Sequence, residues 1–260
     1  MLTHDIHVHT FLSRCGKPDA IPEDYIKKAK EQGIKVLGFS DHLWDSDVEG
    51  ATPWYQSQNL EHLLKIKELL PKQIDGIKIL IGCETEYCGN GKVAITKEHA
   101  KMLDYVLVPV THFHWKGLVL PSHITSSKDM AKLMVDRFRE AVQLGVATGI
   151  AHPFVPGGHT DRLEEILSYI SNDEFEECFG LAAENNVSVE IQTQMHTRDD
   201  NGEYMDVYCR MFEIVKKAGC KVHIGSDAHS MSMFGITDNL RRFVADCQLT
   251  EDDILPLVRA

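Results

Sequence analysis

Short apolar runs alternate with amphipathic segments along the whole chain. The apolar runs, which have the length and composition of buried strands, cover residues 2–9, 35–40, 77–81, 105–110, 146–151, 187–191 and 221–224. Apolar residues at helical spacing predict helices over residues 21–30, 59–70, 130–144, 174–185, 205–218 and 236–246. Strands that alternate with helices in this way imply a parallel sheet that is buried on both faces.

Seven such strand–helix units in a chain of 260 residues favour a closed α/β barrel over an open sheet. No repeat, low-complexity stretch or linker separates the units, so we expect residues 1–260 to form a single domain. Residues 155–162, which include Pro156-Gly157-Gly158, predict a long loop over the ends of the strands.

The net charge and the cysteine content limit which binding partners and which cellular compartment are expected. The net charge of −12 gives no long-range attraction to nucleic acid or to an anionic membrane, so long nucleic acid is not an expected partner. No signal-peptide pattern occurs, and the apolar runs are too short to span a bilayer. Seven cysteines, an odd number without a CxxC pair, predict a reduced, cytoplasmic protein.

Histidine and carboxylate residues stand at nearly every predicted strand end. In chain order they are His7 and His9, Asp41 and His42, Glu84, His112 and His114, His152, and Asp227 and His229. Each has an ordinary explanation alone, as a surface histidine, a capping aspartate or a loop glutamate. Together, at six of seven strand ends, they predict a polynuclear metal site at the mouth of a barrel. Nitrogen and carboxylate donors suit Zn, Mn or Fe rather than Ca or Mg alone.

Spacing predicts how some of these side chains act. Residues i and i+2 of a strand point the same way, so His7 and His9 can hold one ion, and Asp5 on the same face can orient a ligand. Asp41 either orients a ligand or caps a helix. His152 precedes a proline and is therefore expected to be extended.

Two choices between neighbouring residues remain at the strand ends. Glu84 is preferred over Glu86 as a bridging carboxylate because it lies nearer the predicted strand end, and either His112 or His114 can bind. No chemistry is assigned to a further set of histidines, which stand in helix, loop or mid-strand contexts: His62, His99, His123 and His223.

This ordered set of residues resembles the polymerase-and-histidinol-phosphatase (PHP) family along the whole chain. The resemblance implies a distorted (β/α)7 TIM-like barrel with two or three divalent metal ions. It implies a first ion held by His7, His9, Glu84 and Asp227, and a second held by Glu84, His112 and His152. It also implies a third ion held by His42, His229 and the residue at position 15.

Position 15 departs from the family pattern. Many relatives have a histidine there, whereas this chain has Cys15. A thiolate at this position can bind zinc, or the residue can be a buried thiol that leaves the third ion weak or absent.

Phosphate ester hydrolysis fits such an ion cluster best, because clustered divalent ions generate hydroxide from water and clamp the attacking and leaving oxygens. Asp227 is the expected partner of the attacking water. The candidate acids and phosphate clamps are His196, Arg14 and Arg198, although Arg198 is also explained as a plain loop charge.

Among family members, the resemblance points first to a phosphomonoesterase of the histidinol-phosphatase type, acting on a small phosphorylated substrate in histidine biosynthesis. Three alternatives stay open: a phosphodiesterase or exonuclease acting on nucleotides or short oligonucleotides, a metal-binding module without turnover, and an amide or lactone hydrolase.

Overall fold

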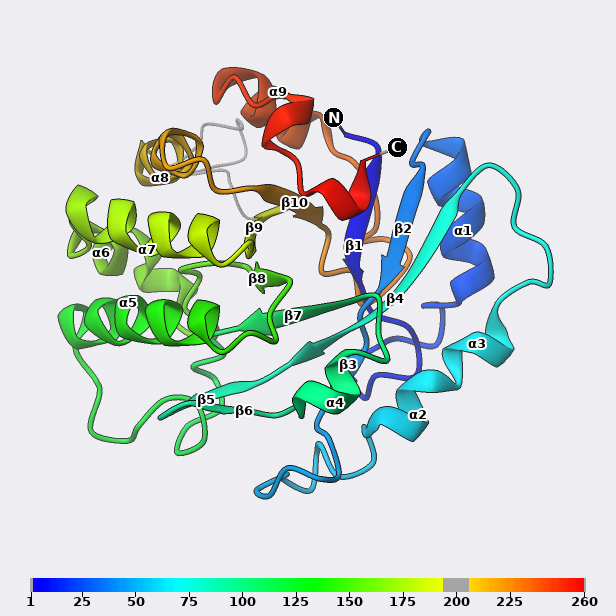
Figure 1. Cartoon of the computed structure of the whole chain (residues 1–260), viewed down its shortest axis with the longest axis horizontal. Coiled ribbons are helices and arrows are strands. Elements are labelled where there is room, and N and C mark those ends of the chain that lie inside the picture. Colours follow the sequence, from blue (N-terminus) through cyan, green and yellow to red (C-terminus); the bar gives the residue numbers. More distant parts are fainter. Residues whose placement is uncertain (1, 194–205, 260) are drawn as a thin grey trace.

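A computed structural model of the chain describes residues 2–193 and 206–259. At its centre seven parallel strands follow one another around a nearly closed barrel, as the sequence predicts (Figure 1). In sheet order they are β1 (His4–Val8), β2 (Val36–Phe39), β4 (Lys78–Thr85), β7 (Tyr105–Pro109), β8 (Gly149–Ala151), β9 (Ser188–Gln192) and β10 (Val222–Gly225).

Helices lie outside this ring of strands (Figure 1). They are α1 (Pro22–Glu31), α2 (Leu60–Leu64), α3 (Ile66–Leu69), α4 (Lys97–Ala100), α5 (Ser127–Gln143), α6 (Leu163–Ser168), α7 (Asn172–Glu184), α8 (Asp206–Lys217) and α9 (Asp238–Asp246). Side-chain caps set where several begin, and Ser171 and Glu174 form a capping box at α7. Short elements follow the strand ends: β3 (His42–Leu43), β5 (Tyr87–Gly89) and β6 (Lys92–Val93).

The structure differs from the sequence-based elements mainly in three places. The helix predicted over 59–70 is two short helices, α2 and α3. The strand predicted over 77–81 continues to Thr85, so Glu84 lies within β4 rather than beyond it. Helices α4 and α6 were not predicted, because each spans only one to two turns and leaves too short an apolar repeat to detect.

The barrel closes where β1 meets the segment that follows β10. The backbone N–H of Asp227 donates to the carbonyl of His7 at 2.8 Å, and the N–H of His9 donates to the carbonyl of Ala228 at 2.9 Å. These bonds bring the histidines at the end of the first strand beside the last His/Asp segment of the chain.

Two buried side chains of β1 complete the same seam. The ring Nε2 of His4 accepts a hydrogen bond from the N–H of Ile224 at 2.9 Å. The carboxylate of Asp5 accepts from the N–H groups of His7 and Ser226, each at 3.1 Å. Asp5 therefore fixes the backbone on both sides of the seam, and does not orient a ligand ring as the sequence suggested.

Tyr105 crosses the barrel interior from β7 over two glycines of neighbouring strands. A Cβ atom at Gly82 would lie 2.5 Å from the Tyr105 ring, and one at Gly38 would lie 2.5 Å from its hydroxyl. The phenol is fully buried, so it cannot swing into solvent to make room. Only glycine fits at these two positions.

We expect Gly82→Ala to lower the free energy of unfolding by about 1–3 kcal/mol, since the added methyl overpacks a full interior. Gly180→Ala is the matched control, because Gly180 lies in α7 with nothing within 4 Å of its would-be Cβ. That change should stabilise the protein by about 0.5–1 kcal/mol. Urea unfolding measures both, and a Gly82→Ala protein as stable as wild type would refute the packing argument.

Candidate metal centre

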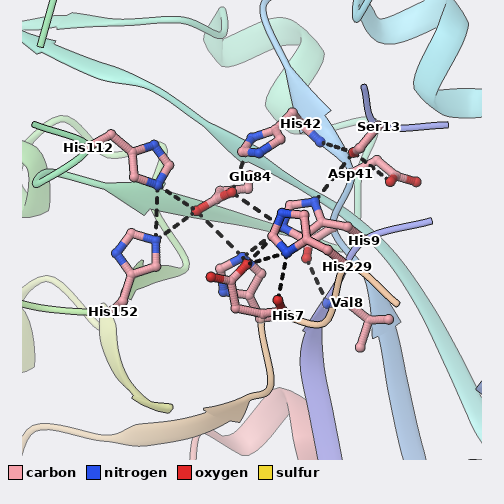
Figure 2. Close-up of polar contacts among 12 residues, drawn as sticks. His7, Val8, His9, Ser13, Asp41, His42, Glu84, His112, His152 and His229 are labelled. Carbon is pink, nitrogen blue, oxygen red and sulfur yellow. Dashed lines mark hydrogen bonds and ion pairs between the residues drawn. The ribbon is translucent and has the colours of Figure 1, made fainter. Parts of the chain in front are cut away.

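The mouth of the barrel brings together three groups of candidate metal ligands. Among them, Figure 2 labels His7, His9, His42, Glu84, His112, His152 and His229. Within each group the donor atoms all lie within 4.8 Å of one another. The groups are His7, His9, Glu84 and Asp227; Glu84, His112 and His152; and His9, Cys15, His42 and His229. Glu84 belongs to two of the groups and therefore stands where a bridging carboxylate would.

The first group has the spacing of a coordination shell. His7 Nε2 and His9 Nε2 lie 3.2 Å apart, and they lie 3.4 and 3.2 Å from Asp227 Oδ1. Their distances to the carboxylate oxygens of Glu84 are 3.5 and 3.4 Å. Ligands about 2.0–2.1 Å from a tetrahedral ion lie roughly 3.3 Å from one another, so these four side chains fit around one cation.

The tautomer of His7 supports the same conclusion. Its Nδ1 lies 2.6 Å from a buried carboxylate oxygen of Glu190 and donates to it, which leaves the Nε2 lone pair pointing into the group. Burial by itself lowers the pKa of His7, but the charges of Glu190, Glu84 and Asp227 raise it well above the ordinary value. The site therefore favours a positive charge between its donors, which a proton or a metal ion supplies.

In the second group, too, the imidazole nitrogens face one another, and a carboxylate outside the group bonds to one ring. His112 Nε2 lies 3.2 Å from His152 Nε2, and His152 Nε2 lies 3.0 Å from Glu84 Oε1. His112 Nδ1 bonds to Glu86 Oε1 at 2.6 Å, and the hydroxyl of Tyr55 donates to the same oxygen. Despite burial, Glu86 and Glu84 raise the pKa of His112 to about 9.

The third group contains a buried donor nitrogen that makes no hydrogen bond. Within the described part of the chain, the buried Nδ1 of His42 makes no hydrogen bond, although it lies 3.1 Å from Glu84 Oε2. His229 Nδ1 bonds to the carbonyl of Asp227 at 2.8 Å, so its Nε2 is available to a cation. Burial raises the pKa of the Cys15 thiol to about 12, so binding a metal there displaces a proton.

Asp41 fixes the loop that carries Cys15. Its carboxylate accepts 2.7 Å hydrogen bonds from the backbone N–H and the hydroxyl of Thr10 and from the hydroxyl of Ser13. Ser13 in turn accepts from the N–H of His42 at 3.0 Å. Asp41 therefore neither caps a helix nor contacts the His42 ring.

Glu84 is buried and carries its charge through these contacts. Burial raises its pKa, but His7, His42 and His112 together lower it well below the ordinary value. The carboxylate is thus ionised and ready to share its two oxygens between neighbouring cations.

Two candidate ligands have backbone conformations that L-residues rarely adopt. Asp227 has φ 52° and His152 has φ 29°. The expectation of an extended His152 is wrong, because the Glu190 carboxylate holds its N–H at 3.2 Å and the ring packs against His112. Such strain persists only where surrounding contacts enforce it, and functional sites are where it gathers.

The structure places the remaining predicted residues as follows. His114 lies next to His112, with ring centroids 5.0 Å apart, but is in none of the donor groups. The Arg14 guanidinium donates to the carbonyl of Pro53 at 3.1 Å. His196 and Arg198 lie outside the described residues.

Glu190 and Glu86 are the residues whose roles the sequence did not reveal. Glu190 lies within β9, and its second neighbour is His223, to which no chemistry was assigned. His223 Nδ1 contacts the hydroxyl of Ser188 at 2.8 Å, which extends the polar chain behind His7. A charged residue within a buried apolar strand was the available signal, because a buried carboxylate needs a partner.

A cavity of about 200 Å³ opens beside the donor groups. Among the described residues it is lined by Cys15, His42, Trp54, Glu84, His112, His114, Trp115, Asp227 and His229. Within the same part of the chain, no helix is long and apolar enough to cross a membrane.

Comparison with known protein families shows to which family the chain belongs. The model of the PHP domain matches residues 5–194. The chain belongs to the PHP family. Two proteins named probable phosphatases, from Proteus mirabilis and Yersinia enterocolitica, are each 25% identical to it over 252 and 253 residues. Each alignment covers 96% of this chain and 88% of the relative.

A solved structure shares the fold of this PHP protein. The histidinol phosphate phosphatase from Lactococcus lactis, solved with zinc, L-histidinol and phosphate, superposes with a TM-score of 0.66 at 17% identity. The match covers 96% of this chain and 95% of that one, so the whole barrel is shared.

We expect Cys15→Ser to lose about one equivalent of bound zinc. His9 is shared with the first group, so without Cys15 only His42 and His229 belong to the third group alone, too few for a stable zinc site. Cys88→Ser is the control, since Cys88 is also a half-buried free thiol but is in none of the donor groups. Metal analysis after zinc loading and gel filtration measures the difference. Equal zinc content in wild type and Cys15→Ser would show that Cys15 is only a thiol of the core.

Proposed function

We propose that this PHP protein is a metal-dependent phosphomonoesterase of the histidinol-phosphatase type, with two or three zinc ions as its resident metals. The observation that carries the proposal is a pair of donor groups that share Glu84. In each group a further carboxylate bonds to Nδ1 of one histidine, Glu190 to His7 and Glu86 to His112. The names of its relatives and the shared fold of the histidinol phosphate phosphatase point the same way.

The ligand chemistry favours zinc over metals that prefer oxygen ligands. The donor set is mainly imidazole with carboxylate oxygen, and the third group adds the sulfur of Cys15. Imidazole and thiolate donors suit zinc, whereas magnesium and calcium prefer sites built from oxygen alone.

The ions would be held by the three donor groups described above, and when bound they supply activated water and positive charge that neutralises a phosphoryl group. The protein side chains prepare the site for this chemistry. Glu190 and Glu86 hold the proton on Nδ1 of His7 and His112, so that each Nε2 stays free as a donor.

Asp227 is the residue we assign to the attacking water. Its carboxylate lies at the end of the first donor group and also lines the cavity, so it can both bind a cation and accept a proton. Burial raises its pKa, but the neighbouring His7 and His9 lower it below the ordinary value, which keeps it ionised. Gln192 Nε2 donates to its other oxygen at 3.2 Å and restricts its orientation.

The cavity suits a small ester better than a nucleic acid. Its volume of about 200 Å³ is below the range of about 300–1,000 Å³ that drug-sized ligands need. The described residues that line it include no lysine or arginine, so none of them provides the charge that would bind a chain of successive phosphates.

We expect Asp227→Ala to lower the phosphatase kcat by at least about a hundredfold, because it removes both a ligand and the proton acceptor. Asp238→Ala serves as the control, since its side chain is fully exposed on α9. Turnover of histidinol phosphate by the zinc-loaded proteins gives the comparison, with circular dichroism to check the fold. If Asp227→Ala keeps most of the wild-type rate at normal zinc content, the assigned role of Asp227 is wrong.

A further inference from the structure

The cavity beside the donor groups is bordered by an arc of aromatic rings. Trp54 lies edge-on to the His42 ring with centroids 5.2 Å apart, and Trp115 lies 5.2 Å from Trp54. The arc continues from Trp115 to His114 at 5.4 Å and from His114 to His112 at 5.0 Å. The arc therefore runs from His42, a donor of the third group, to His112, a donor of the second group.

The two tryptophans of this arc are supported from behind. Both are half-buried and pack against a small core of Trp44, Tyr55 and Ala94, while their remaining surface lines the cavity. Tyr55 is fully buried and holds Glu86 through its hydroxyl, which ties this core to the second donor group. The indole rings are thus fixed surfaces at the edge of the metal centre.

Hydrogen bonds also fix the loop of Trp54 to the loop that carries Cys15. The Arg14 guanidinium donates to the carbonyl of Pro53 at 3.1 Å, and the backbone N–H of Arg14 donates to Gln58 Oε1 at 2.9 Å. The amide of Gln58 then donates to the carbonyl of Trp54 at 3.0 Å. These bonds hold the backbone of Trp54, and the small core packs against its ring, so the indole binds a ligand without a large loss of conformational freedom.

Charge limits what can lie against these rings. The carboxylates that line the cavity are Glu84 and Asp227, and no lysine or arginine of the described chain joins them there. With Glu84 and Asp227 committed to the donor groups, the described lining residues offer no ion-pair partner to an additional anionic group on the ligand. A flat neutral ring would stack on an indole, and a cationic ring would gain cation–π attraction as well.

We propose that Trp54 and Trp115 bind the alcohol portion of the phosphate ester, and that this portion carries a planar aromatic ring that is neutral or cationic. The inference rests on the proposed phosphomonoesterase function, because it places the phosphate at the donor groups and the ring against the arc. It assigns the two tryptophans a role in specificity and leaves the chemical step to the residues of the metal centre.

A matched pair of substrates isolates the aromatic contribution. 2-Phenylethyl phosphate and 2-cyclohexylethyl phosphate have nearly the same size and the same kind of leaving alcohol, but only the first has a flat ring. We expect the zinc-loaded protein to prefer the phenyl compound by roughly three- to tenfold in kcat/KM, mainly through KM, as stacking energies suggest. Calorimetry with the corresponding phosphonates, 3-phenylpropyl- and 3-cyclohexylpropylphosphonate, gives a binding preference without turnover.

Variants then test which side chains produce the preference. Trp54→Leu and Trp115→Leu should each reduce it to less than twofold, whereas Trp54→Phe should retain most of it. Tyr169→Leu is the control, because Tyr169 is an aromatic side chain that is 50% exposed after α6 and does not line the cavity. It should leave the preference unchanged.

The outcomes separate this inference from the proposed function. If neither ester is hydrolysed but the phenyl phosphonate binds more tightly in wild type and not in Trp54→Leu, the phosphatase proposal fails and the aromatic site stands. Equal kcat/KM for the two esters, or equal loss of both in the leucine variants, would overturn the aromatic site while phosphatase activity remains. The absence of both phosphonate binding and turnover would overturn both.

Discussion

The buried carboxylate of Glu84 is the interaction on which the arrangement of the site depends. Imidazole nitrogens of His7, His9, His42 and His152 lie within 3.5 Å of its two oxygens. A buried anion of this kind is costly unless cations or hydrogen bonds compensate it. The imidazole nitrogens that face one another also need a positive charge between them. The carboxylate and the rings together therefore favour a cation at the centre, which a proton or a metal ion supplies.

Barrel closure places these groups within reach of one another. The seam between β1 and the segment after β10 is held by Asp5, which accepts from backbone N–H groups on both sides. Burial raises the pKa of Asp5 to about 7. Keeping this carboxylate ionised at the seam therefore costs free energy, which other contacts of the fold must offset. The unusual backbone of Asp227 lies at the same seam and turns its carboxylate toward His9. Fold and site are therefore coupled at one edge of the barrel.

Much of this arrangement follows from sequence because parallel barrels gather strand ends at one mouth. Strand periodicity pairs His7 with His9, and the last apolar run puts Asp227 at the same mouth. Their grouping around one ion came from the resemblance to the PHP family. Glu190 could not, since its effect depends on a contact with a residue 183 positions away in the chain. His152 shows the other limit, because tertiary contacts override the local preference that a following proline imposes.

Anomalous diffraction from crystals loaded with zinc tests the central claim most directly. The account predicts two zinc ions that share the Glu84 carboxylate, at about 2.0–2.2 Å from its oxygens. One ion would also contact His7, His9 and Asp227, and the other would contact His112 and His152. Fully occupied zinc with the Glu84 carboxylate bound to neither ion, or zinc bound only at other sites, would contradict it.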